Sequence, residues 1–170
     1  MNTLVSPIDN FIIMESAAQL GNRLREVILN GVWIANTNYK DQLSGLDWKL
    51  AVTRVHSLNT IELLTRHVHY YIAGIIKVFE GGPLDIKDKY SFDFVPVQSQ
   101  EEWETVLRLM WESVEKFAEL AGQLSEEKLD AIFIDAKYGT YRRNIEAMIE
   151  HSYYHLGQIV LIKKILLTDK

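Results

Sequence analysis

Apolar residues recur every three or four positions in four long stretches of the chain, and this spacing is the strongest constraint on its fold. The clearest stretch follows Ser99, with apolar side chains at Trp103, Val106, Leu107, Met110, Val114, Phe117 and Leu120. Three prolines and nine glycines in 170 residues are too few for the frequent turns of a multi-strand β fold. The pattern therefore predicts an all-α protein.

The predicted helices cover residues 14–29, 59–79, 99–120 and 142–167. Glycines 81 and 82 followed by Pro83 end the second helix. Ser99 and Glu102 have the spacing of a capping box at the start of the third. Short helical turns are predicted near residues 41–43, 48–52 and 125–129, and residues 131–133 and 138–140 have the pattern of a short extended pairing.

Four amphipathic helices bury their apolar faces most simply as a four-helix bundle. About 19 residues join the second and third helices, and at roughly 3.3 Å per extended residue they span more than a helix of about 20 residues at 1.5 Å each. A long crossover is therefore allowed, so an up-down-down-up bundle is as permissible as a simple up-and-down bundle. The length fits a single domain over residues 1–170.

Composition excludes several function classes. The net charge is −5, from 18 basic and 23 acidic side chains, so the chain lacks the basic excess that binds nucleic acid. There is no cysteine, which excludes disulfides, thiolate metal sites and a cysteine nucleophile. Residues 1–10 do not resemble a secretion signal, and no apolar run approaches the roughly 18 residues of a membrane span. We therefore expect a cytoplasmic protein without membrane or nucleic-acid partners.

Two histidines of the fourth predicted helix lie within its apolar stripe. His151 and His155 are four residues apart and so share one helix face, together with Asn144 and Gln158. Burying two imidazoles without partners would cost a few kcal/mol, so another group must satisfy them. Imidazoles one helical turn apart can bind one ion at about 2.0–2.1 Å, which makes the pair a candidate metal site.

His67 is the candidate for a third ligand, because it lies at the edge of the buried stripe near the middle of the second helix. His69 falls among charged residues and is expected to face solvent, and His56 precedes the helix in a region without a clear pattern. Three imidazoles suit zinc, nickel or ferrous iron. The alternative is that each buried histidine simply bonds a tyrosine, glutamine or backbone group. Asn144 and Gln158 would then form a polar layer that sets the helix register, instead of orienting the imidazoles.

Two segments resemble a known family. They are residues 59–71, NTIELLTRHVHYY, and residues 150–159, EHSYYHLGQI. Both resemble the DinB-like (DinB/YfiT) superfamily of metalloenzymes, in which one histidine of the second helix and two of a His-x-x-x-His-x-Gly-Gln segment bind a divalent metal. The matching positions here are His67, His151 and His155. Residues 31–56 and 81–98 carry no motif of that family.

The resemblance implies a bundle of up-down-down-up topology, a homodimer, and bound zinc or nickel, or in some relatives iron. Several members of the superfamily are transferases or isomerases that use a low-molecular-weight thiol such as bacillithiol or mycothiol. The expected function is thus a metal-dependent, thiol-using transferase acting on a small molecule. In such a site the metal activates a thiol or a water at its open position.

Three other functions stay open at this point: a metal-dependent hydrolase, a non-catalytic metal-binding module, and a metal-free dimer. A dimer interface would use the aromatic side chains of the third helix, Trp103, Trp111 and Phe117. For an enzyme, Tyr71, Tyr141 and Tyr154 are candidate phenol donors and Glu150 is a candidate base. Asp88 and Asp93, in the crossover segment, are candidates for residues at the entrance to the site.

Overall fold

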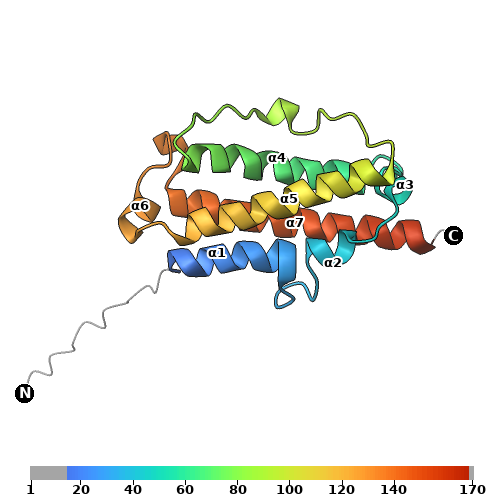
Figure 1. The fold of residues 1–170 in the computed structure, drawn as a ribbon, viewed down its shortest axis with the longest axis horizontal. Helices are drawn as coiled ribbons and strands as arrows, with labels where there is room; N and C mark the ends of the chain where they lie inside the picture. Colours follow the sequence, from blue (N-terminus) through green and yellow to red (C-terminus); the bar gives the residue numbers. More distant parts are fainter. Residues whose placement is uncertain (1–14, 169–170) are drawn as a thin grey trace, which may run out of the picture.

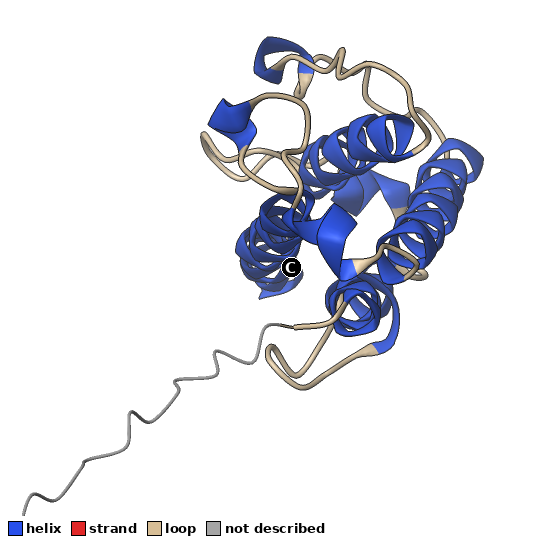
Figure 2. Ribbon diagram, turned by 90° about the vertical axis from the view of Figure 1, so that its left-hand side faces the viewer, coloured by secondary structure: helices blue, strands red, loops and turns tan. Residues whose placement is uncertain are grey.

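The computed structural model describes residues 15–168, and most of this segment is helical. Within it no β-strand forms, and the extended pairing predicted between residues 131–133 and 138–140 is an isolated bridge from Ile132 to Thr140. The prediction of an all-α protein is confirmed for these residues (Figure 2). Met14, where the first helix was predicted to begin, lies outside the described segment.

Four long helices correspond to the four predicted stretches. They are α1 (Ala17–Arg25), α4 (Ile61–Phe79), α5 (Gln100–Gly122) and α7 (Tyr141–Thr168). Shorter helices are α2 (Tyr39–Leu43), α3 (Trp48–Ala51) and α6 (Glu126–Asp130), and single 3₁₀ turns form at Asp88–Tyr90 and Ala136–Tyr138. The first predicted helix differs at its end, because Glu26–Asn30 forms a π-helical turn after α1.

Hydroxyl side chains fix the starts of the long helices. Ser16, Thr60 and Ser99 each accept a hydrogen bond from the backbone N–H three residues later. At α1, Gln19 also accepts from the backbone N–H of Ser16, which completes a capping box. At α5, the predicted Glu102 carboxylate instead accepts from the N–H of Gln98, one residue before the cap. The cap residues therefore set the helix boundaries close to those predicted.

The four long helices lie side by side around one core. Helix α5 packs on α1 and α4, and α7 packs on α4 and α1. In Figure 1, α1 and α7 run from left to right along the long axis, whereas α4 and α5 run from right to left. The crossover between α4 and α5 (residues 80–99) returns along the outer side of α4, at the top of Figure 1.

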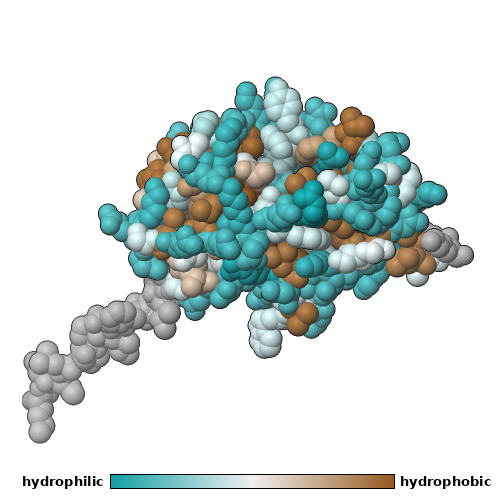
Figure 3. Space-filling model, viewed as in Figure 1, coloured by the Kyte–Doolittle hydropathy of each residue, from teal (hydrophilic) through white to brown (hydrophobic). Residues whose placement is uncertain are grey.

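The apolar stripes of the long helices form the core. Trp103 and Phe117 are fully buried there and so cannot form the exposed dimer face considered above, whereas Trp111 is half-buried. The face seen in Figure 3 is mostly hydrophilic, with small scattered hydrophobic patches. Among residues 15–168, no helix combines the length and the apolar character needed to cross a membrane.

We predict that Gly21→Ala destabilises the protein by about 1–3 kcal/mol, because an added methyl group would overpack the interface between α1 and α5. A Cβ at Gly21 would lie 2.6 Å from the backbone carbonyl oxygen of Ala118. Gly157→Ala is the matched control, since a Cβ there has no neighbour within 4 Å. It should stabilise α7 by about 0.5–1 kcal/mol. Urea unfolding followed by circular dichroism measures both, and equal effects would contradict the close packing.

Candidate metal centre

The packing of α4 against α7 brings together His67, His151 and His155, the three histidines predicted from the sequence. One ring nitrogen of each lies within 4.8 Å of those of the other two. The Nε2 atom of His151 is central, 3.2 Å from Nε2 of His67 and 2.8 Å from Nε2 of His155. The ring nitrogens of His151 and His155 on α7 and of His67 on α4 thus converge on a common point.

The outer nitrogens of two rings face carbonyl oxygens. Nδ1 of His67 lies 3.3 Å from the backbone oxygen of Ser91, and Nδ1 of His155 lies 2.7 Å from the amide oxygen of Gln158. A carbonyl oxygen can only accept, so each Nδ1 carries the proton and donates it. In the neutral rings of His67 and His155, Nε2 is therefore left with a lone pair directed at His151.

Three neutral rings cannot satisfy this arrangement by themselves. His151 can donate a proton from Nε2 to one neighbour, and the lone pair of the other neighbour then faces the same nitrogen without a donor. A cation at the common point removes the conflict, because it accepts all three lone pairs. Two imidazole nitrogens bound tetrahedrally to one zinc ion lie about 3.3 Å apart, close to the shorter separations here. The donor set therefore fits a divalent metal.

Burial keeps the rings in the form that binds metal. His67 and His155 are each 5% exposed and His151 is half-buried. Loss of hydration lowers the pKa of all three, and for His67 and His151 the positive charge of neighbouring imidazoles lowers it further. The pKa of His151 falls to about 4. The rings are thus neutral near pH 7, as a metal ligand must be.

The crossover segment holds the ring of His67 from the outer side. The buried Ser91 supplies the carbonyl oxygen for Nδ1, and the ring of Phe92 stacks on the imidazole with 3.9 Å between centroids and 9° between planes. Tyr71 meets the same imidazole edge-on at 5.1 Å. Sequence reasoning missed Ser91 and Phe92, because a non-helical segment has no periodicity that could show which side chains face inward.

A cavity of about 490 Å³ opens beside His67 and His151. Its walls come from α4, α7, the crossover and the segment before α7, and include Ile75, Ile86, Asp88, Phe133 and Met148. The Tyr71 hydroxyl donates to the Asp88 carboxylate at 2.6 Å, and burial raises the pKa of Tyr71 to about 12. Asp88 thus lines the space beside the histidines, and Asp93 does not.

Most of the other candidate residues are engaged elsewhere. Glu150 is exposed and pairs with Arg143 at 3.0 Å, and Tyr141 packs edge-on against Phe79 in the core. Tyr154 meets the ring of His155 at 4.8 Å but is 63% exposed.

The amides of Gln158 and Asn144 have different roles. Gln158 orients His155, whereas the Asn144 amide donates to the backbone oxygens of Tyr138 and Thr140 at the start of α7. Gln158 thus contacts one of the candidate metal ligands directly, whereas Asn144 stabilises the entry into the helix and also lines the cavity beside the histidines.

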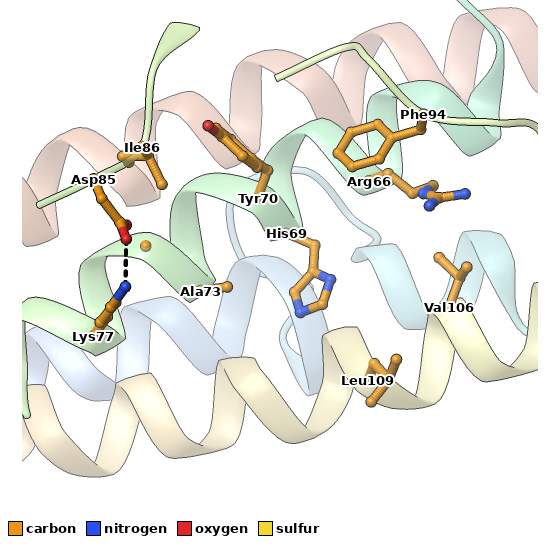
Figure 4. Close-up of a pocket in the computed structure, with 11 residues that line it drawn as sticks. Arg66, His69, Tyr70, Ala73, Lys77, Asp85, Ile86, Phe94, Val106 and Leu109 are labelled. Carbon is orange, nitrogen blue, oxygen red and sulfur yellow. Dashed lines mark hydrogen bonds and ion pairs between the residues drawn. The ribbon is translucent and has the colours of Figure 1, made fainter. Parts of the chain in front are cut away.

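His69 is half-buried, which corrects the prediction that it faces solvent. Its Nε2 lies 2.9 Å from the hydroxyl oxygen of Ser113 on α5. Figure 4 shows its ring pointing toward α5 in a second cavity of about 450 Å³, with Tyr70 and the Lys77–Asp85 ion pair nearby. The prediction used the charged neighbours of His69 on the helical wheel, but two of them, Arg66 and Lys77, line this cavity. His69 is not among the histidines that converge.

Comparisons of the chain with protein-family models, with curated proteins and with solved structures find no match. The resemblance to the DinB-like superfamily therefore stays a prediction from the sequence. The site is defined by its own geometry: converging ring nitrogens, fixed tautomers and an adjoining cavity. In residues 15–168, the group that could hold an ion consists of these three histidines, with no fourth histidine, aspartate or glutamate.

We predict that the metal-free protein loses stability as the pH falls from 6.5 toward 4. The pKa of His151 is about 4 in the folded state against 6.5 ordinarily, so between these values the unfolded chain takes up a proton that the folded chain does not. His151→Gln should make this loss shallower. Urea unfolding in chelator at pH 7, 6 and 5 tests it, and parallel profiles for the two proteins would contradict the buried, neutral ring.

Proposed function

We propose that this protein is a divalent-metal-binding enzyme of the DinB-like type, in which His67, His151 and His155 hold the ion. One observation carries the proposal: ring nitrogens whose outer partners fix their tautomers converge 2.8 and 3.2 Å from His151. Neutral histidines bonded only to protein groups have no reason to direct their lone pairs at one another. Three nitrogen donors suit zinc or nickel, and also ferrous iron.

The helix arrangement supports the same assignment. The directions of α1, α4, α5 and α7 in Figure 1 agree with a four-helix bundle of up-down-down-up topology, and residues 80–99 agree with its long crossover. In that topology α4 and α7 run in opposite directions and pack against each other. A single histidine on α4 then meets two on α7, as the resemblance implies.

Three protein ligands and an adjoining cavity favour an open site over a closed structural one, which has four protein ligands. A divalent ion held there would lower the pKa of a thiol or water at its open position toward neutrality. The chain has no cysteine, so a thiol would come from outside. Because the resemblance implies a thiol-using enzyme, we favour a thiol-dependent transferase, with a hydrolase as the alternative. Ser91 and Gln158 would keep the Nδ1 protons in place, so that Nε2 remains the donor atom.

We predict that the protein purified without chelator and reconstituted with zinc or nickel holds one ion per chain, and that His151→Ala with His155→Ala abolishes this. Elemental analysis after desalting measures the ratio. His69→Ala is the matched control and should retain the metal, because its ring bonds Ser113 in the other cavity. Equal metal content in wild type and double variant would contradict the proposed site.

The same preparations distinguish the two reactions. A transferase should join a small thiol to an electrophilic acceptor in the loaded wild type and not in the double variant. A hydrolase should cleave activated esters or amides without added thiol. If the metal-loaded protein shows neither activity over a broad set of substrates, a non-catalytic metal-binding module becomes the better explanation.

We further predict that Gln158→Leu weakens metal binding about 10–100-fold, because the Nδ1 proton of His155 loses its acceptor. Gln158→Glu keeps an acceptor oxygen at the same place and should retain affinity close to that of the wild type. Competition with a chromogenic chelator measures both dissociation constants. Equal losses in the two variants would show that the orientation of His155 does not depend on this hydrogen bond.

A further inference from the structure

The geometry points to a small molecule as the ligand of the cavity beside His67 and His151, with its donor end at the histidines and with an uncharged, mostly apolar body. This inference rests on the proposed metal site and adds the substrate class. It follows from three features of the cavity: its apolar walls, the charge of its lining, and the way in which the crossover forms its roof.

The body of the cavity is mostly apolar. Apart from the histidines, its lining contains the apolar side chains Ile75, Leu84, Ile86, Phe133, Ala147 and Met148, and the polar side chains Tyr71, Asp88, Tyr138 and Asn144. Ile75 lies eight residues after His67 on α4, which places it about 12 Å farther along the helix at 1.5 Å per residue. A ligand bound at the histidines would therefore extend along apolar walls for roughly the length of a substituted benzene ring. A charged group placed there would lose its hydration without compensation.

The lining contains an acidic side chain and no basic one. Asp88 is exposed at the cavity edge, where it accepts the hydrogen bond of Tyr71, and no lysine or arginine is part of the lining. The neighbouring Lys89 instead lies over the ring of Tyr90, and Arg143 pairs with Glu150. A ligand carboxylate away from the histidines would therefore meet a like charge and no cation. The lining thus disfavours anionic ligands.

The crossover forms a fixed roof over this space. Leu84, Ile86 and Asp88 line the cavity, whereas Asp85 pairs with Lys77 at the second cavity, which Ile86 also borders. The crossover therefore runs between the two cavities at this point. A Cβ at Gly74 would lie 2.4 Å from Ile86, so glycine allows the roof to sit directly on α4. The roof is therefore held by packing, and its side chains define the space below.

Two probes that differ by one carboxylate test the inference: phenylmethanethiol and 4-(mercaptomethyl)benzoate. Thiols bind zinc-like ions well, and cobalt(II) in the full-length protein reports their binding by visible absorption. We expect the uncharged thiol to bind about tenfold more tightly than the carboxylate. Asp88→Asn should narrow this ratio, because it removes the like charge from the lining. Equal affinities for the two thiols in the wild type would overturn the inference.

A substitution that fills the cavity provides the second arm. Ala147→Trp should weaken phenylmethanethiol binding at least about tenfold while the protein still holds one cobalt ion. Ala73→Trp is the matched control, because Ala73 lines the second cavity, and it should leave the affinity unchanged. If Ala147→Trp does not fold, as judged by circular dichroism, Leu84→Trp fills the same space from the roof.

The outcomes separate this inference from the proposed function. If the wild type holds one ion and the Ala147→Trp variant binds phenylmethanethiol as tightly as the wild type does, the metal site stands and the inference is wrong. If the wild type holds no ion, the proposed function and the inference are both wrong. Tight binding of the carboxylate with unchanged metal content would instead indicate an anionic substrate.

Discussion

The hydrogen bonds from Nδ1 of His67 and His155 to carbonyl oxygens are the interactions on which the site depends. The backbone oxygen of Ser91 and the amide oxygen of Gln158 face these nitrogens, and each oxygen accepts the proton that its ring carries on Nδ1. Each Nε2 is then a lone-pair donor aimed at His151. Imidazoles can be buried in an apolar interior when protein groups bond them. Such bonds do not explain why the Nε2 lone pairs of His67 and His155 both face His151. A metal ion at that point would accept these lone pairs, which is why the proposal depends more on the tautomers than on the number of histidines.

The helices supply the geometry that these bonds require. His151 and His155 are one turn apart on α7, and α4 places His67 opposite them, so three separate turns share one level of the core. The caps at Thr60 and Ser99 fix where α4 and α5 begin. Close packing at Gly21 brings α1 against α5 on the opposite side. Helix packing thus sets the position of the three histidines. The crossover segment and Gln158 determine which ring nitrogen of His67 and His155 carries the proton.

Helical periodicity carries most of what the sequence predicts here. It locates the four long helices within a few residues and places His67, His151 and His155 on buried faces. It fails for His69, since a wheel for one helix does not show that Ser113 of α5 lies within reach. It also misses the π-helical turn at Glu26–Asn30, whose residues keep the same apolar spacing. The sequence indicated Asp88 as a residue at the entrance to the site but gave no sign of Ser91 and Phe92, because their segment has no helical period and contacts the site through tertiary packing alone.

The crossover connects these observations. Two successive helices that run in the same direction need a connection as long as a helix, and residues 80–99 provide it between α4 and α5. Such a connection must pass over one face of the molecule, and here it passes over the face of α4 that carries His67. There it supplies the carbonyl oxygen of Ser91, the stacked ring of Phe92 and the roof of the cavity. A segment required by chain direction therefore also contacts the candidate metal centre and lines the cavity beside it.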